Sequence, residues 1–480
     1  MEAATLVPRK KLYAGGAWHD ADAAYPLFSP YDGRRLAEIP LCNLKDLDKA
    51  VVAALFAFKE FSQWPAHKRS LVLRKTAEMI GARKKEFAET ITSENSKPIK
   101  ASFAEVERTV QTFMFAAEEA KRIEGFTIPM DAAPSGEGRV AFTIRQPIGV
   151  IGAITPFNFP LNLVAHKVAP AIASGNCVVL KPARQTPMTS LLLAEVMDET
   201  DFPPGALNVV TGDGALLGSA LAEDPRIAMI TFTGSPPVGA EIKKRAGMKR
   251  VLLELGSNSA LIVDEGSNLP EVVQRSVEGA FSFAGQVCIS VQRIYVHESL
   301  YPAFVADFVA LAEGLKIGDP FDETTALSAM ITPQDVDRVL SWIQEATEHG
   351  AKVACGGTAE GTLMRPTVLT GVGPQEKISS MEAFAPVVVI NPFKELAEAI
   401  EGVNNSRYGL NAGVFTQNLQ HAFEAVRKLQ VGAVLINDTP TFRVDHMPYG
   451  GVKESGTGRE GIRYAIEEMT ELKLASFKLG

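Results

Sequence analysis

Residues 150–183 read VIGAITPFNFPLNLVAHKVAPAIASGNCVVLKPA, and their pattern indicates the class of fold. Two short apolar runs, Val150–Ile154 and Cys177–Leu180, flank Leu161–Ala173, which has the length and apolar content of a helix. A glycine and an asparagine follow the predicted helix and are typical of a helix end. Because the apolar runs do not alternate with polar residues, we expect strands buried on both faces, as in a parallel sheet covered by helices.

The same alternation of strands and helices continues outward from this stretch. Upstream, residues 45–120 carry apolar side chains at helical spacing. Downstream, residues 188–200 are predicted to be helical, and three further strands are predicted at Leu207–Val210, Ile227–Phe232 and Val251–Leu255. Strands that alternate with helices in this way predict a doubly wound nucleotide-binding domain.

A second alternating region covers residues 258–437. Its candidate strands are Leu261–Val263, Pro386–Ile390 and Ala433–Ile436, and its candidate helices are residues 333–349 and 418–429. The predicted fold is therefore α/β, with two doubly wound, Rossmann-like domains built on parallel sheets.

Two segments fit neither domain. Ile123–Ala141 is polar and contains three glycines, among them Gly125, and two prolines, whereas Glu471–Leu479 alternates apolar and polar residues like an edge strand. Because an exposed edge strand invites pairing with another chain, we expect an oligomer contact there.

The composition excludes several classes of protein. With 48 basic and 56 acidic residues the net charge is −8, which argues against a nucleic-acid binder. Four cysteines are too few for a disulfide framework and indicate free thiols in a reducing compartment. Residues 1–11 lack the apolar run of a signal peptide, and Leu161–Leu180 is too interrupted to span a membrane. We expect a soluble, cytoplasmic protein without a nucleic-acid or membrane partner.

Cys288 lies among small and polar residues, after a helical pattern, in the sequence AGQVCIS of residues 284–290. A nucleophilic cysteine needs access and a group that stabilises its thiolate. The alternative for Cys288, as for Cys42, Cys177 and Cys355, is a small buried thiol. The seven histidines are scattered, so neither a cysteine hydrolase with a histidine base nor a metal cluster is predicted.

Two polar residues stand at the ends of predicted strands. Glu254 lies in the apolar sequence LLELG, where burial raises the pKa of a carboxyl toward the range of a general base. Its alternative is a carboxylate satisfied by backbone donors. Asn158 lies in TPFNFP, where its amide is placed to donate to an oxyanion, and its alternative is a turn or N-cap residue.

Two glycine-containing loops each follow a predicted strand and precede a predicted helix. They are Thr211–Gly214 and Phe232–Ser235, and in such loops the backbone approaches a diphosphate at a helix N-terminus. Pro236 and Pro237 suit the first turn of the second helix because no backbone N–H is needed there. Neither loop has the full G-x-G-x-x-G pattern.

Taken together, these motifs resemble those of the aldehyde dehydrogenase superfamily. The resemblance covers nearly the whole chain, with the motifs in the family's order. They are PFNFP at 156–160, KPA at 181–183, FTGS at 232–235, ELG at 254–256, GQVC at 285–288, EAFAP at 382–386 and PYGGVKESG at 448–456.

The resemblance implies a catalytic role for four residues. Cys288 matches the nucleophile and Glu254 the base that activates water for hydrolysis of the thioester. Asn158, with the backbone N–H of Cys288, matches the oxyanion hole, and Lys181 matches a lysine that contacts the cofactor and supports the site. The implied reaction is the NAD- or NADP-dependent oxidation of an aldehyde to a carboxylate.

The resemblance also implies a set of cofactor contacts. Ser235 matches the serine that holds the diphosphate, and Glu382 matches the carboxylate on the nicotinamide ribose, with Phe384 beside the ring. The full implied set is Thr155, Pro156, Lys181, Ala183, Arg184, Gly214, Phe232, Gly234, Ser235, Val238, Leu255, Gly256, Glu382 and Phe384.

The implied architecture has three parts. Residues 1–120 and 142–255 form the cofactor domain, to which residues 453–470 return, and residues 256–452 form the catalytic domain. Residues 121–141 and 471–480 form a small β oligomerisation arm, so a homodimer or homotetramer is expected.

The sequence departs from the family pattern at three positions. Ser257 and Ala385 replace usual glycines near the cofactor. Arg184 stands where a glutamate commonly binds the adenosine ribose, which removes a carboxylate that would repel a 2′-phosphate. We therefore expect NADP to be accepted, the alternative being a solvated arginine and use of NAD.

For the substrate, the sequence looks closest to enzymes that oxidise lactaldehyde, phosphonoacetaldehyde or, without phosphorylation, glyceraldehyde 3-phosphate. Arg108 and Arg443 match positions at the substrate mouth, where arginine binds a carboxylate or phosphonate, and their alternative is a structural salt bridge. Val287 and Phe159 add apolar walls. We expect a small aldehyde, hydroxylated or anionic, and semialdehydes belong to the same class.

Two other functions remain open at the level of sequence. A coenzyme A-acylating semialdehyde dehydrogenase shares the scaffold but typically lacks the base that Glu254 matches. A catalytically silent scaffold protein need not keep nucleophile, base and oxyanion donor together, and all three are present here.

Overall fold

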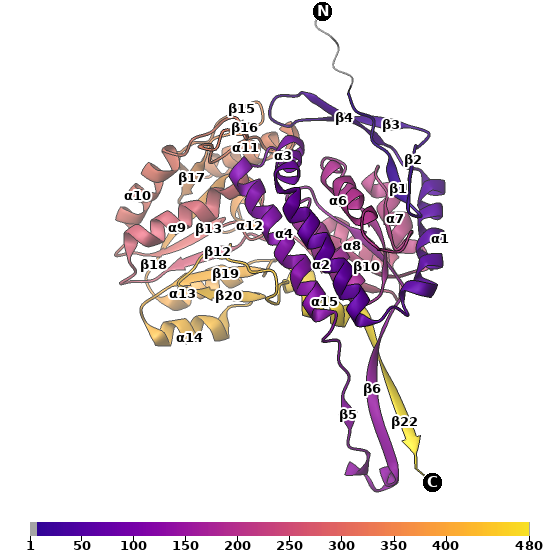
Figure 1. The fold of residues 1–480 in the computed structure, drawn as a ribbon. Coiled ribbons are helices and arrows are strands. Elements are labelled where there is room, and N and C mark those ends of the chain that lie inside the picture. The colour runs from indigo at the N-terminus through magenta and orange to yellow at the C-terminus, as the bar shows by residue number, and fades with distance from the viewer. Residues whose placement is uncertain (1–6, 480) are drawn as a thin grey trace, which may run out of the picture.

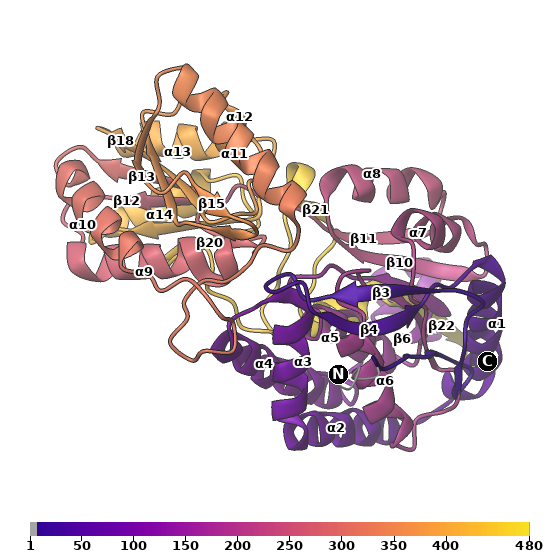
Figure 2. The same ribbon diagram turned by 90° about the horizontal axis from the view of Figure 1, so that it is seen from above.

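The computed structural model describes residues 7–479 (Figure 1). Residues 1–6 and Gly480 lie outside the described residues. They include the two ends of the predicted domains and much of residues 1–11, for which no signal peptide is predicted. Two α/β bodies lie side by side, and a slender arm extends from one of them (Figures 1 and 2). None of the helices within residues 7–479 is long and apolar enough to cross a membrane.

The first body is built on an eight-stranded sheet. In spatial order its strands are β2 (Ala17–His19), β1 (Leu12–Ala14), β9 (Leu207–Val209), β8 (Cys177–Lys181), β7 (Val150–Ile154), β10 (Ile227–Thr233), β11 (Arg250–Glu254) and β21 (Gly456–Thr457). The five strands from β9 to β11 are parallel, and the chain steps to one side of β7 and then to the other. In such sheets the carboxyl ends of the strands flank a ligand-binding crevice at the point of reversal.

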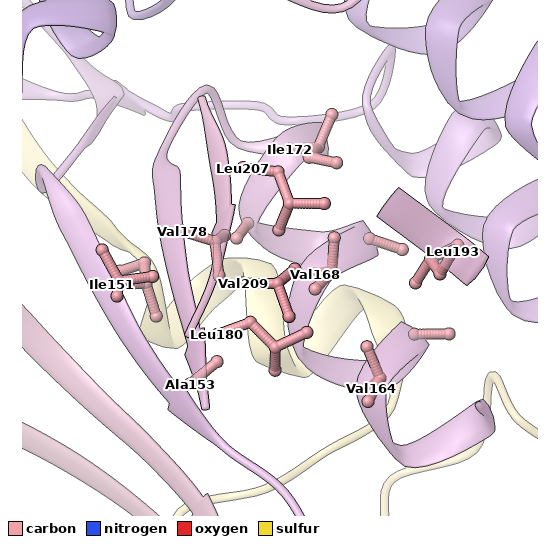
Figure 3. Close-up of a cluster of buried hydrophobic side chains, with 14 of the residues drawn as sticks. Ile151, Ala153, Val164, Val168, Ile172, Val178, Leu180, Leu193, Leu207 and Val209 are labelled. Atoms are coloured by element: carbon pink, nitrogen blue, oxygen red, sulfur yellow. The ribbon is translucent and has the colours of Figure 1, made fainter. Parts of the chain in front are cut away.

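Helices cover both faces of this sheet (Figure 1). They are α1 (Leu44–Phe61), α2 (Ala66–Ala82), α3 (Lys84–Asn95), α4 (Ile99–Glu119), α5 (Asn162–Ala173), α6 (Met188–Asp198), α7 (Gly214–Glu223), α8 (Pro236–Arg245) and α15 (Ile462–Glu468). Every residue of α5 is buried. Figure 3 shows the reason, because Val164, Val168 and Ile172 of α5 face aliphatic side chains of β7, β8 and β9.

The second body contains a seven-stranded sheet. Its order is β14 (Lys352–Cys355), β17 (Thr367–Thr370), β18 (Val387–Phe393), β13 (Arg293–His297), β12 (Ala260–Val263), β19 (Asn411–Phe415) and β20 (Ala433–Ile436). All neighbours are parallel except β14 and β17. The covering helices are α9 (Leu269–Phe281), α10 (Tyr301–Glu313), α11 (Pro333–Glu348), α12 (Lys377–Ser380), α13 (Leu396–Asn404) and α14 (Leu419–Lys428). The predicted α/β fold with two parallel sheets is confirmed.

The arm is a third, three-stranded sheet. β22 (Thr470–Lys478) pairs antiparallel with the whole of β6 (Arg139–Pro147), which also pairs with β5 (Thr127–Ile128). β22 is therefore an edge strand, as its alternating sequence predicts. Apolar side chains on this sheet are exposed, among them Val140, Phe142, Ile144, Leu472, Leu474 and Phe477.

The first strands of the chain had no counterpart in the sequence analysis. β1 and β2 form an antiparallel hairpin that adds an edge to the first sheet through a single pairing of Tyr13 with Val209. β3 (Ala24–Phe28) and β4 (Arg35–Pro40) form a separate hairpin. The remaining short strands β15 (Ala359–Glu360) and β16 (Leu363–Met364) pair with each other beside the second sheet.

Candidate active site

A strained turn presents Cys288. After α9 the chain enters a short 3-10 helix, η3 (Ser282–Gly285), in which Phe283, Ala284 and Gly285 have φ angles of 47°, 52° and 68°. Only glycine fits at Gly285, because a Cβ atom there would collide with the carbonyl of Ala385. This turn follows the end of α9 and brings the next residues of the chain to the edge of a cavity.

Cys288 lines a cavity of about 370 Å³ at the junction of the two bodies. The walls mix apolar and polar side chains, and three of them are cationic. The lining side chains that matter below are Arg108, Phe159, Asn162, Arg275, Thr439, Thr441, Arg443 and Tyr449. The predicted substrate residues Arg108 and Arg443 thus lie in the same cavity as the predicted nucleophile.

The thiol of Cys288 has one polar neighbour at close range. Its Sγ atom lies 2.8 Å from the hydroxyl oxygen of Tyr449. Burial raises the pKa of the Cys288 thiol to about 11, while the hydrogen bond from Tyr449 and the charge of Arg443 act in the opposite direction. Tyr449 lies in the PYGGVKESG motif, but no local pattern predicts its role, because 161 residues separate it from the cysteine.

Asn158 lies beside the Cys288 loop. It follows β7, and its Nδ2 donates a hydrogen bond to the carbonyl of Gln286 at 2.9 Å. The amide group has a second N–H for another acceptor. Lys97, which is fully buried against Glu105, donates to the Asn158 carbonyl at 2.6 Å and fixes this segment. Asn158 does not cap a helix, because α5 begins at Asn162 after Leu161.

Glu254 ends β11 and is buried. Neither of its carboxylate oxygens has a hydrogen-bond partner among residues 7–479, so backbone donors do not satisfy it. Burial, reinforced by the negative charge of Glu460, raises the pKa of Glu254 well above its usual range. The backbone of Gly450 passes close by, since a Cβ atom there would lie 2.9 Å from Oε1 of Glu254.

A buried polar network lies behind these groups. Lys167 of α5 donates to Glu460 at 2.7 Å, and Glu460 also accepts from Arg443 at 3.3 Å. These contacts lower the pKa of Glu460 to about 2 although it is buried. The sequence signal was present, because a lysine in the apolar sequence of α5 requires a buried partner.

Arg108 and Arg443 differ in how fully they are paired. Arg108 makes two hydrogen bonds to Asp445, at 2.7 and 3.1 Å, which fits the salt-bridge alternative. Asp445 also bonds to His166 at 2.9 Å. The side chain of Arg443 is only 6% exposed, and its Nε has no partner within the part of the chain that the structure describes.

The predicted cofactor residues gather at the carboxyl ends of β7, β8, β10 and β11, where the first sheet reverses. The strand β7 is followed by Thr155 and Pro156, and β11 is followed by Leu255 and Gly256. At the end of β8 lie Lys181, Ala183 and Arg184. At the end of β10 lie Phe232, Gly234 and Ser235. Two glycines there permit a close approach, because a Cβ atom at Gly234 or Gly256 would collide with Phe232 or Glu382. Such an edge fits a dinucleotide.

The two glycine-containing loops precede helices, as predicted. Gly214 opens α7 behind Asp213, whose side chain accepts from the N–H of Leu216. Ser235 precedes α8, and its side chain makes no capping hydrogen bond, so its hydroxyl is free for another partner. Val238, in the first turn of α8, is exposed.

Lys181 is buried at the end of β8, and burial lowers the pKa of its ammonium group to about 8. Glu382 reaches the same crevice from the second body and accepts a hydrogen bond from the N–H of Ser257 at 2.9 Å. Burial raises the pKa of Glu382 to about 7. The ring of Phe384 meets that of Phe157 edge-on at 5.8 Å.

Arg184 lies at the outer end of this crevice. Its side chain is exposed, and its guanidinium group stacks on the ring of Tyr25 at 4.7 Å. The hydroxyl of Tyr25 donates to the Arg184 carbonyl at 3.0 Å. This contact with a neutral ring does not neutralise the guanidinium group, which leaves its charge available to an anion.

Comparisons with known proteins agree with this geometry. Residues 18–475 match the Aldehyde dehydrogenase family. The 3-sulfolactaldehyde dehydrogenase of Priestia megaterium is 46% identical over 479 residues, which cover 100% of both chains. Two solved structures superpose with a TM-score of 0.96. One is aldehyde dehydrogenase 21 from Physcomitrella patens in complex with the product succinate, 39% identical over 99% of both chains.

The other is the NADP-dependent glyceraldehyde-3-phosphate dehydrogenase from Bacillus halodurans, complexed with NADP, which is 34% identical. It covers 98% of this chain and 100% of the solved chain. The resemblance seen in the sequence is confirmed by a match that spans almost all residues and by the agreement of the two folds. This chain belongs to the aldehyde dehydrogenase family.

Proposed function

We propose that the chain oxidises a small anionic aldehyde to its carboxylate, with Cys288 as the nucleophile. One observation carries the proposal: Asn158 donates a hydrogen bond to the Cys288 loop, and the buried, unpartnered carboxylate of Glu254 is close enough for its charge to act on the Cys288 thiol. In this reading, the first sheet holds the cofactor and the second body supplies the nucleophile.

Each group has a step to perform. The Cys288 thiolate attacks the aldehyde carbon, and Asn158 Nδ2 with the Cys288 N–H donates to the oxygen that becomes negative. A nicotinamide bound in the crevice would accept the hydride that leaves this carbon when the oxyanion collapses, so that a thioester remains on Cys288. Glu254 then takes a proton from water, whose oxygen attacks the Cys288 thioester, and the carbon–sulfur bond breaks to release the carboxylate and restore the thiolate.

The crevice residues support binding of NAD or NADP. Ser235 and the backbone near Gly234 would hold the diphosphate at the start of α8, and Glu382 would bind the nicotinamide ribose. Lys181 would contact the adenosine ribose. Arg184 supports the use of NADP, because an exposed guanidinium group stacked on Tyr25 is suited to a 2′-phosphate.

The cavity supports an anionic substrate. The three similar proteins are named for, or bind, compounds that carry a sulfonate, a carboxylate or a phosphate. In this chain Arg443, which is ion-paired with Glu460, lines the same cavity as Cys288, and its Nε has no hydrogen-bond partner among residues 7–479. The hydroxyls of Thr439 and Thr441 lie alongside for a substrate hydroxyl. We therefore favour 3-sulfolactaldehyde as the substrate.

The test compares 3-sulfolactaldehyde with lactaldehyde, which differ by the sulfonate. Reduced-cofactor formation is followed with NAD and NADP, without and with coenzyme A, and with Cys288→Ala as the control. We expect turnover without coenzyme A that Cys288→Ala abolishes, with the higher kcat/KM for the anionic aldehyde. A strict requirement for coenzyme A would contradict hydrolysis, and equal values of kcat/KM would contradict the anion subsite.

We also propose that the chain forms a homodimer through the arm, and the dimers can pair into a tetramer. The exposed edge of β22 and the exposed apolar residues of its sheet would be covered by a second copy. The second body has its own uncovered edge at β20 and an apolar face on α14 formed by Leu419, Phe423 and Val426. Sedimentation of the purified protein gives the oligomeric state.

A further inference from the structure

The hydroxyl group of Tyr449 touches the sulfur on which the proposed reaction depends. Its oxygen lies 2.8 Å from Cys288 Sγ, and within residues 7–479 it is the sole hydrogen-bond partner of that sulfur. Tyr449 is only 3% exposed. The contact is therefore shielded from bulk water. In such a shielded place a hydrogen bond to a charged group is stronger than at the surface.

Three contacts fix the position of the Tyr449 ring. The backbone N–H and C=O of Tyr449 exchange hydrogen bonds with Glu460, at 3.0 and 2.7 Å. The guanidinium group of Arg443 lies 3.7 Å from the ring centre, and Ile289 packs in the same small apolar cluster. The hydroxyl is thus held in place by the backbone and by packing, independently of the sulfur.

The direction of the hydrogen bond follows from the chemistry of the two groups. Burial raises the pKa of Tyr449 well above its usual range, so the phenol keeps its proton. A thiolate has no proton and can only accept. Once the sulfur is ionised, the hydrogen bond runs from the Tyr449 hydroxyl to Cys288 Sγ.

We propose that Tyr449 is a further catalytic residue, which donates its hydroxyl hydrogen bond to the Cys288 thiolate. The thiolate exists twice in the cycle, before it attacks the aldehyde and when the thioester carbon expels it after water adds. One donor in a fixed position stabilises both states. The place of this donor in the catalytic cycle rests on the proposed function, whereas the experiment that tests the donor does not.

Other charged groups also face the sulfur. Arg443 favours the thiolate, whereas Glu382 and Glu254 disfavour it. Tyr449→Phe leaves all three in place and keeps the ring under Arg443, so it removes the hydroxyl alone. Tyr13→Phe is a matched control, because Tyr13 is also buried and its hydroxyl donates to a distant partner, Asp198, at 2.6 Å.

The experiment measures alkylation of Cys288 by iodoacetamide from pH 6 to pH 12, a range that passes the raised pKa of the buried thiol, about 11, without aldehyde or cofactor. A thiolate with a lower pKa is more abundant but intrinsically less reactive. For Tyr449→Phe we therefore expect about a tenfold slower reaction at pH 7, a midpoint moved to higher pH, and a plateau at high pH that equals or exceeds that of the unmodified enzyme. Tyr13→Phe should follow the unmodified enzyme throughout.

An unchanged alkylation midpoint in Tyr449→Phe would overturn the proposal, even if turnover fell. A uniform slowing at every pH would overturn it as well, since that is the result of a displaced loop and not of a lost donor. If the midpoint moves but the unmodified enzyme oxidises no aldehyde, the inference about Tyr449 holds and the proposed function fails.

Discussion

At the level of single residues, Glu254 separates the two halves of the proposed reaction. Glu254→Gln keeps the shape of the side chain and removes the base, so the thioester should form and then persist. We expect a burst of reduced cofactor equal to the number of sites, followed by turnover that is about 10² to 10⁴ times slower. Rapid mixing measures both phases. Loss of the burst along with turnover would place Glu254 in an earlier step.

The same substitution has a consequence for stability. The pKa of Glu254 is raised in the folded protein, so this carboxyl favours the fold while it is protonated and opposes it as the pH rises from the unfolded value toward the raised folded value. Glu254→Gln stays neutral, and we expect its Tm to exceed that of the unmodified enzyme at pH 8 but to equal it at pH 4. A lower Tm at pH 8 would mean that the carboxylate has a cation partner.

Arg184 controls the choice of cofactor in the proposed function. Arg184→Glu places a carboxylate where the 2′-phosphate would lie, and we expect the ratio of kcat/KM for NADP over NAD to fall about 10- to 100-fold. Arg184→Gln removes the charge without adding repulsion, so its ratio should lie between those of the unmodified enzyme and of Arg184→Glu. A ratio that does not change would mean that Arg184 is merely solvated.

At the level of elements, the turn before Cys288 depends on a glycine. Gly285→Ala forces a side chain into the carbonyl of Ala385 at a φ of 68°. We expect a loss of about 1–3 kcal/mol in the free energy of unfolding and a large loss of turnover, measured by denaturant titration and by assay. Gly373→Ala is the control, because its added methyl group meets only ordinary contacts at 3.7 Å or more.

The sequence predicts some elements much better than others. β7 and the first four residues of β8 are apolar runs, which mark strands buried in a parallel sheet, whereas the equally apolar β20 is half-buried at the edge of the second sheet. β1 is only three residues long, and it joins the first sheet by pairing with β9, which lies almost 200 residues later in the chain. No local sequence pattern predicts such a strand. The turn at Phe283 and Ala284 was equally hidden, because neither residue type favours a positive φ.

The residues of the predicted site also divide into those that a local motif identifies and those that no local pattern predicts. Motifs identified Cys288, Glu254 and Asn158 by resemblance, and the structure brings the elements that carry them together. Tyr449, Lys167 and Glu460 were not assigned because their partners are distant in the chain. Side-chain pairing across such distances follows from the packing of whole elements and not from any local spacing.

At the level of the whole molecule, the arm is expected to hold two copies together. Leu474 and Phe477 of β22 are exposed, so polar substitutions there do not disturb the interior of one chain. We expect Leu474→Asp combined with Phe477→Asp to break the dimer contact of the arm, so that a dimer sediments as monomers and a tetramer as a smaller species, with little change in secondary structure. Met248→Asp, a fully exposed apolar position elsewhere, is the control and should keep the oligomeric state.

The last part of the chain also governs how the protein is made. Lys167 leaves the ribosome 293 residues before Glu460, the carboxylate that neutralises it inside the first body. Until that segment arrives, α5 carries an uncompensated ammonium group, and the first sheet lacks β21. Tyr449 and Arg443 are translated in the same late stretch. The first body therefore cannot complete its fold until Glu460 and β21 have been synthesised, and we expect the unfinished sheet to be prone to aggregation until then.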